Sequence, residues 1–110
     1  MPFWRRRGKG GASATTSTRA DRSSVETYLR DFVDTRLFVE AYVEPSTNVT
    51  STTVVLIAHD GEWTRRAVES REQAFELAKK LDIPVYDVNQ TGYPARMREW
   101  TARQRREGRG

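Results

Sequence analysis

Arginine and lysine side chains, which bind phosphate groups, are concentrated at the two ends of this 110-residue sequence. Residues 1–20 contain five basic and no acidic residues, and residues 95–110 contain six basic and two acidic residues. The segment between them, residues 21–94, contains eight basic and 13 acidic residues and is therefore acidic. Such asymmetry is typical of a protein whose ends contact a polyanion.

Two groups of residues could therefore bind a nucleic acid. One lies near the N-terminus, and the other lies on a predicted C-terminal helix. At 100° per residue, Met97 and Trp100 share one sector of that helix and could dock on the domain, while the arginines spread round the rest. The alternative is a solvated arm with a short anchor. The candidates are Arg5, Arg6, Arg7 and Lys9 in the first group, and Arg96, Arg98, Trp100, Arg103, Arg105 and Arg106 in the second.

A second candidate site is a loop that could bind a small ligand. Asn89, Gln90, Thr91 and Gly92 follow a predicted strand and precede the C-terminal helix. Their side chains offer hydrogen-bond donors and acceptors, and backbone N–H groups at the start of a helix attract anions. Ordinary turn chemistry is the alternative, with Gly92 supplying a permissive dihedral angle and Thr91 or Asn89 capping the helix.

Residues for catalysis or metal binding are scarce. His59 is the only histidine, and there is no cysteine. His59 ends a predicted strand beside an Asp60–Gly61 turn, where a polar residue is ordinary. The glycines near the N-terminus do not lie between a strand and a helix, so they form no phosphate-binding loop. We therefore predict no catalytic residue, no metal site and no cofactor.

Trp63 and Arg65 alternate along a predicted strand and share one of its faces, whereas Arg66 points to the other. A stacked pair of Trp63 and Arg65 could contact nucleic acid or a protein partner. The alternative is ordinary cross-strand packing against Glu40 or Tyr42.

The pattern of apolar residues predicts seven elements. Ser23 and Glu26 are spaced as a capping box before an apolar stripe, and Ser70 and Gln73 are spaced as a second one. Strands are predicted at residues 37–44, 52–59, 63–68 and 83–88, and a third helix from Pro94 to about residue 106. The predicted fold is α+β, a two-layer α-β-β-β-α-β-α arrangement. Its small four-stranded sheet is mixed and mainly antiparallel, with the first two helices on one face.

This pattern divides the chain into three parts. Residues 1–20 form a predicted disordered basic tail, because they lack apolar periodicity. Residues 21–93 form a compact α/β domain, and residues 94–110 form a basic helix with a frayed end. Because no cysteine, membrane-spanning run or secretory signal is present, we expect a cytoplasmic protein without stable membrane insertion.

The chain resembles two groups of known proteins. Residues 23–82 resemble the double-stranded-RNA-binding domain in their α-β-β-β-α order, but the second helix begins with Ser70, Arg71 and Glu72 instead of a basic cluster, so no binding residue is transferred. The whole chain resembles short actinobacterial proteins without an established activity, through FWRRR, TTVVLIAHDGEWTRR and IPVYDVNQTGYPARMREW. Some of those carry an oxidoreductase label that no residue here supports.

These observations favour a non-enzymatic binding or accessory protein whose basic ends engage a polyanion, foremost RNA or a ribonucleoprotein. The first alternative is a protein–protein adaptor without a nucleic-acid role. The second is a small cofactor-dependent enzyme such as an oxidoreductase. The sequence leaves the oligomeric state open.

Overall fold

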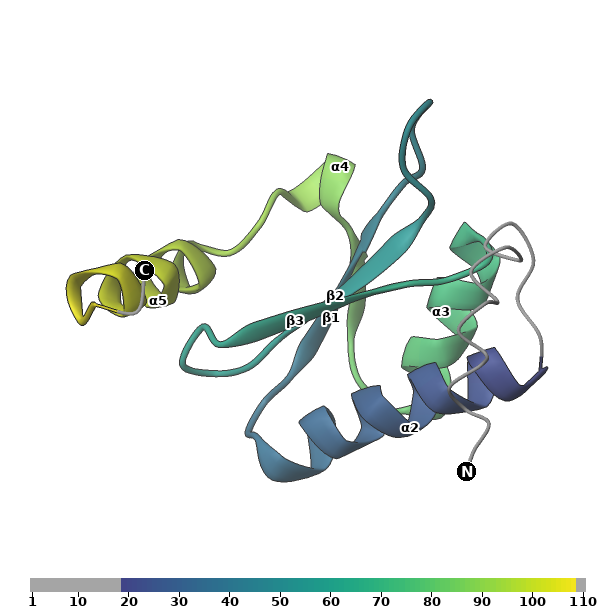
Figure 1. Ribbon diagram of the computed structural model, residues 1–110, viewed down its shortest axis with the longest axis horizontal. Helices are drawn as coiled ribbons and strands as arrows, with labels where there is room; N and C mark the ends of the chain where they lie inside the picture. The colour runs from purple at the N-terminus through teal and green to yellow at the C-terminus, as the bar shows by residue number, and fades with distance from the viewer. Residues whose placement is uncertain (1–18, 109–110) are drawn as a thin grey trace, which may run out of the picture.

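The computed structural model describes residues 19–108, and residues 1–18 and 109–110 lie outside the described part of the chain. The predicted α+β class and mixed four-stranded sheet are confirmed, and a short helical turn, α4, is additional (Figure 1). The elements in chain order are α2 (Arg19–Thr35), β1 (Glu40–Glu44), β2 (Thr53–Ile57), β3 (Trp63–Ala67), α3 (Arg71–Lys80), β4 (Val85–Asp87), α4 (Val88–Thr91) and α5 (Ala95–Arg106).

The strands lie in the order β3-β2-β1-β4. β1 and β2 pair antiparallel, as do β2 and β3, whereas β4 pairs parallel with β1. β2 is central, as its dense apolar run predicts, and the short β4 lies at an edge next to Pro84. β2 and β3 are joined by the predicted tight turn, in which the N–H of Gly61 donates to the carbonyl oxygen of Ala58 (2.9 Å).

Helices α2 and α3 cover one face of the sheet. Leu29 and Phe32 of α2 meet Ala74 and Leu77 of α3 in one buried cluster. Alternate residues of the central strands point into this cluster because successive side chains of a strand lie on opposite faces. These residues are Ala41, Val43, Val54 and Leu56 of the strands, with Val39 and Ala58 directly beside the strand ends.

The opposite face of the sheet has its own buried cluster. Tyr42, Val55 and Ile57 pack with Met97 of α5, and Trp63 packs against them. Val55 and Ile57 have no exposed surface. The central strands are therefore buried on both faces, and Figure 1 shows α5 set apart from α2 and α3.

The first helix begins earlier than its predicted cap. α2 starts at Arg19, so Ser23 lies inside the helix and the first capping box is wrong. The helix begins earlier because Arg19 and Ala20, which precede Ser23, are good helix formers and no glycine or proline there stops the helix. Glu26 instead forms ion pairs with Arg30 (2.9 Å) and Lys80 (3.7 Å). The predicted disordered tail, as far as residue 18, lies outside the described residues.

The other helix starts agree closely with the sequence. The Oγ of Ser70 accepts a hydrogen bond from the N–H of Gln73 (3.1 Å), which confirms the second N-cap. Pro94 is the N-cap residue of α5, one position before the helical position that we predicted for it. A difference of one residue is common at helix ends.

The first strand is shorter than predicted. β1 begins at Glu40, and Leu37 and Phe38 are 68% and 76% exposed. Phe38 has a φ of +49°, which an extended strand does not allow. The predicted strand start at Leu37 is therefore wrong, because the chain turns between α2 and β1 before the strand begins.

Truncation of Leu56 tests the first core cluster. Leu56 has no exposed surface, so Leu56→Ala should lower the free energy of unfolding by about 2–5 kcal/mol. His59 is exposed, and His59→Ala should change it by less than about 0.5 kcal/mol. Urea denaturation monitored by circular dichroism measures both. A similar loss for the two variants would contradict this placement of the core.

Candidate nucleic-acid interface

Arg96 joins α5 to the sheet. Its Nη2 donates to Oε1 of Glu40 (2.7 Å), and its Nε donates to the carbonyl oxygen of Ala58 (2.9 Å). Glu40 also accepts from the hydroxyl of Tyr42 (2.9 Å), and burial together with this bond raises the pKa of Tyr42 to about 12. Arg96, predicted as a nucleic-acid contact, is thus used inside the fold.

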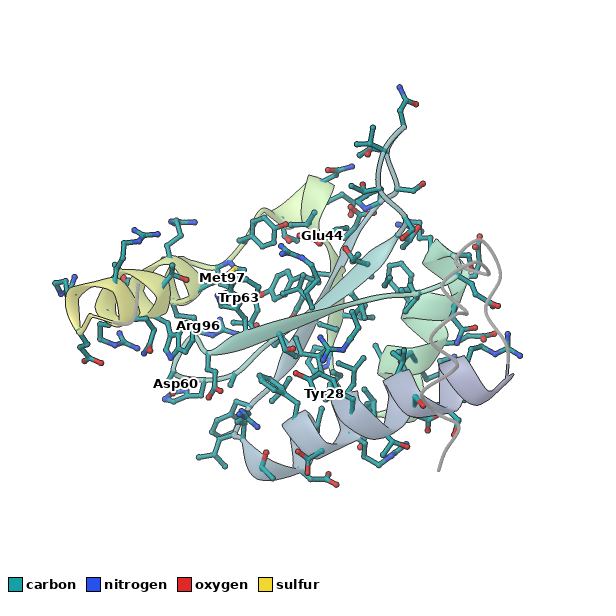
Figure 2. The ribbon with its side chains drawn as sticks, in the orientation of Figure 1. Tyr28, Glu44, Asp60, Trp63, Arg96 and Met97 are labelled. Atoms are coloured by element: carbon teal, nitrogen blue, oxygen red, sulfur yellow. The ribbon has the colours of Figure 1, made fainter. Side chains whose placement is uncertain are left out.

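The β2–β3 turn forms the second half of this junction. A Cβ on Gly61 would lie 2.0 Å from the carbonyl oxygen of Arg96 and 2.8 Å from Cβ of Trp100. The indole N–H of Trp63 donates to Oγ1 of Thr101 (3.2 Å). Figure 2 shows Arg96, Met97 and Trp63 together at this junction. Met97 is buried and Trp100 half-buried, so α5 docks on the domain, which is one of the two arrangements that the sequence left open.

The outward side of α5 presents arginines to solvent. Arg98, Arg105 and Arg106 are exposed and form no ion pair with any described residue. We call these three residues the basic stripe. Arg103 differs, because it is half-buried and its Nη2 donates to the carbonyl oxygen of Asp60 (3.0 Å).

Most of the other arginines whose side chains the structure describes are neutralised by carboxylates. Surface ion pairs of this kind contribute little to stability, but they remove the local positive potential. Arg66 and Lys79 lie outside α5 and have no ion pair within residues 22–108. The paired arginines outside α5 are Arg22 with Glu69, Arg30 with Glu26, Arg36 with Glu62, Arg65 with Glu44, and Arg71 with Asp87.

The N-terminal group of candidates cannot be placed. Arg5, Arg6, Arg7 and Lys9 lie outside the described residues. Their role in binding stays a prediction from the sequence. The structure therefore brings together only part of the predicted basic surface, namely the arginines of α5.

Glu44 is a site-like residue that no sequence pattern singled out. Nε and Nη2 of Arg65 donate to its two oxygens (2.8 and 2.9 Å), and the hydroxyls of Thr53 and Tyr93 also donate to it. Burial raises the pKa of Glu44, but these hydrogen bonds, that from Arg65 foremost, outweigh it and leave the pKa below its usual value. Because its lone pairs are occupied, Glu44 holds the structure together and has no free position for a substrate.

The two neighbouring arginines of β3 lie on opposite faces, as predicted. The guanidinium of Arg65 lies 5.2 Å from the ring centre of Trp63, whereas that of Arg66 lies 3.7 Å from the ring centre of Tyr28. Trp63 packs against the cluster that contains Tyr42, in agreement with the cross-strand alternative, whereas the ion pair of Arg65 is with a different residue. Arg65 reaches across the sheet to Glu44.

The predicted ligand loop is partly helical. Asn89, Gln90 and Thr91 belong to the single turn α4, and Gly92 ends it with a φ of +71°. The carboxylate of Asp87 accepts from the N–H of Asn89 (2.8 Å), so the protein's own anion occupies the position proposed for a ligand. Gln90 and Thr91 nevertheless line an open cleft of about 410 Å³, with Tyr86 among its other walls.

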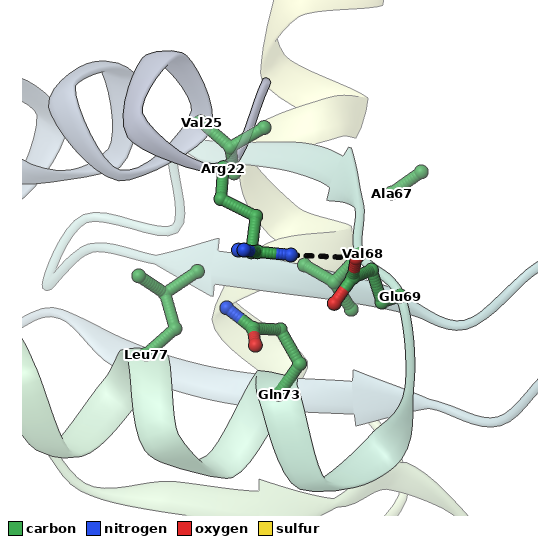
Figure 3. Close-up of a pocket in the computed structure, with 7 residues that line it drawn as sticks. All are labelled: Arg22, Val25, Ala67, Val68, Glu69, Gln73 and Leu77. Atoms are coloured by element: carbon green, nitrogen blue, oxygen red, sulfur yellow. Dashed lines mark hydrogen bonds and ion pairs between the residues drawn. The ribbon is translucent and has the colours of Figure 1, made fainter. Parts of the chain in front are cut away.

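A smaller pocket lies between α2 and α3 (Figure 3). Its volume is about 100 Å³, below that of typical cofactor pockets. The Arg22–Glu69 ion pair (2.8 Å) and the side chain of Gln73 line it. In residues 19–108, no cluster of three or more metal-ligating side chains is present. No helix within that range is long and apolar enough to span a bilayer.

Gly61→Ala tests the junction between α5 and the turn, with Gly92→Ala as a matched control. Both glycines have positive φ (+97° and +71°), so alanine costs about 1 kcal/mol of strain at either position. Only Gly61 also lacks room for a Cβ, which should add about 1–3 kcal/mol and loosen α5. Hydrogen exchange should accelerate in α5 for Gly61→Ala alone. Equal exchange in the two variants would show that α5 is not held by this contact.

Comparisons with protein-family models, curated proteins and solved structures found no match. The likeness to the double-stranded-RNA-binding domain remains one of element order over α2 to α3, and the likeness to short actinobacterial proteins remains a prediction. We therefore infer the function from the contacts, burial and charge of this chain.

Proposed function

We propose that this protein is a non-enzymatic accessory protein that binds RNA through its phosphates. Within the described residues, the contact surface is the basic stripe of α5. The basic residues near the N-terminus add charge of the same sign.

The observation that supports this proposal is the distribution of unpaired charge. Outside α5, only Arg66 among the arginines with described side chains has no carboxylate partner, and it lies over the ring of Tyr28, whereas the three arginines of the basic stripe all lack such a partner among the described residues. An unpaired arginine on an exposed helix face can bind phosphate without first breaking an ion pair. Electrostatic attraction of this kind supplies most non-specific nucleic-acid affinity.

The geometry of α5 suits a phosphate chain. Arg98 and Arg105 are seven residues apart, which places them on one side of the helix about 10 Å from each other. Ala102 lies between them on the same side and does not obstruct the stripe. Because α5 is fixed to the sheet by Arg96 and Met97, binding need not order the helix backbone.

A non-enzymatic role is supported by the polar groups of the fold. The carboxylate of Glu44 is fully occupied by donors, and the Glu40 carboxylate is bound by Arg96 and Tyr42. His59 is exposed at the end of β2, with the ring of Phe38 edge-on at 5.8 Å. His59 lines an open cleft of about 330 Å³ with Asp60 and Glu62, but no carboxylate among the described residues hydrogen-bonds its ring, so it lacks the orienting partner that a general base requires.

A salt titration of RNA binding tests the proposal. Replacing Arg98, Arg105 and Arg106 together with Gln should make the slope of log K against log salt shallower by about 2, since each phosphate contact contributes about 0.7 for a single strand. The control replaces Arg22, Arg30 and Lys80 with Gln. It removes the same charge from the α2–α3 layer and should leave the slope nearly unchanged. Fluorescence anisotropy with a labelled oligonucleotide measures both.

Two outcomes would contradict the proposal. In one, the full chain binds no RNA at low salt, where electrostatic attraction is strongest. In the other, both triple variants lose the same slope, which would mean that net charge matters and the position of the arginines does not.

A protein–protein adaptor is the second candidate, favoured by one observation. Leu37 and Phe38 are both largely exposed, and Phe38 has a positive φ that costs about 1–3 kcal/mol. Exposed neighbouring apolar side chains often mark a protein contact. The test purifies the wild type and the double variant Leu37→Ser with Phe38→Ser after nuclease treatment. A protein that co-purifies with the wild type and not with the double variant would favour the adaptor function. Retention by both would exclude this corner as the contact.

A further inference from the structure

Two tyrosines on the side of the sheet that α5 covers remain partly open to solvent. Tyr86 of β4 and Tyr93, which precedes α5, are each 36% exposed. Both belong to the side of the sheet that α5 covers, because Tyr86 pairs in register with Tyr42 and Tyr93 reaches Glu44. We call Tyr86 and Tyr93 the tyrosine platform.

Both rings are held in place by the fold. The ring of Tyr86 lies 5.3 Å from that of Tyr42, with an angle of 32° between the two planes. The hydroxyl of Tyr93 donates to Glu44, which Arg65 also holds. A ring that is already fixed loses little conformational entropy when a ligand stacks on it.

The surroundings of the platform are both basic and polar. Nη1 of Arg98, in the basic stripe, lies 3.4 Å from the carbonyl oxygen of Tyr93. On the other side, Tyr86 lines the open cleft of about 410 Å³ that also contains Gln90 and Thr91. The platform therefore has a phosphate-binding charge, Arg98, beside Tyr93. Beside Tyr86 it has Gln90 and Thr91, which can hydrogen-bond the edge of a base.

We propose that the tyrosine platform stacks unpaired bases, so that the ligand of the basic stripe is single-stranded RNA. Stacking needs bases that are splayed out of a duplex, whereas phosphate contacts alone would accept any polyanion. This inference rests on the proposed function, since the basic stripe supplies the phosphate contacts. A strand passing over Tyr86 and Tyr93 continues along α5 past Arg98.

The choice of RNA over single-stranded DNA rests on the hydroxyl of Tyr86. It makes no hydrogen bond to any other residue between 19 and 108. A ribose 2′-hydroxyl can both donate and accept, and it is the group by which proteins distinguish RNA from DNA. The free phenol is therefore available to a ribose next to the stacked base.

The ligand-side experiment compares oligonucleotides of equal charge. Four ligands are titrated against the full chain. They are a 12-nucleotide single-stranded RNA, the same RNA with abasic positions at its centre, a duplex of the same sequence, and the matching single-stranded DNA. The intact RNA should bind about tenfold more tightly than the abasic strand for each stacked base, because stacking contributes about 1–3 kcal/mol per base. The duplex and the DNA should bind more weakly than the single-stranded RNA.

The protein-side experiment replaces both tyrosines. Tyr86→Leu with Tyr93→Leu should lose about tenfold or more in affinity for the intact RNA, with an unchanged salt slope, because no phosphate contact is removed. Tyr86→Phe with Tyr93→Phe keeps both rings but removes the Tyr86 hydroxyl, so it should still bind intact RNA more tightly than abasic RNA and should no longer distinguish RNA from single-stranded DNA. Heparin, a polyanion without bases, should bind equally to the wild type and both variants. Circular dichroism confirms that each variant is folded.

Each result is decisive. Equal affinity for intact and abasic RNA, or no loss in the Leu variant, overturns the platform while the salt dependence on α5 still supports the proposed function. Equal binding of RNA and single-stranded DNA overturns the RNA preference. If the full chain binds neither RNA nor heparin at low salt, the proposed function fails and the platform with it.

Discussion

The two central strands bury apolar side chains on both faces of the sheet, and the positions of α2, α3 and α5 follow from this constraint. Val43 and Leu56 point to one side of the sheet, whereas Val55 and Ile57 point to the other, and all four have no exposed surface. An apolar sheet face must be covered to remove it from water. α2 and α3 supply one cover. The other is supplied by α5, which is short and needs the ring of Trp63 to complete it.

This second cover explains where positive charge remains on the surface. α5 has one apolar residue buried in the cluster, Met97, so polar contacts must add to its attachment. Arg96 provides them by binding Glu40 and two carbonyl oxygens. With Arg96 and Arg103 held by the domain, the other three arginines of α5, namely Arg98, Arg105 and Arg106, are exposed to solvent. The helix that closes the core is therefore also the helix that presents unpaired charge.

The same arrangement brings aromatic and basic groups together. After β4, at the edge of the sheet, the chain returns across the face that α5 covers. On this path the hydroxyl of Tyr93 donates a hydrogen bond to Glu44. Arg65 reaches Glu44 from β3, so one carboxylate links three elements of the covered face. Tyr86 lies next to this cluster, on Tyr42. The tyrosine platform and the basic stripe are therefore both placed by the helices and strands of the fold, and neither needs a separate binding loop.

Patterns local in the chain were sufficient for much of this fold. The strand that ends at Glu44, the Asp60–Gly61 turn and the cap at Ser70 depend on neighbours within a few residues, and the structure confirms them. The inward turn of Arg96 could not be foreseen, because its partners lie 38 and 56 residues away in the chain. Composition identifies an arginine as basic. Only the packing of α5 against the sheet determines whether that charge is used inside the fold or remains free at the surface.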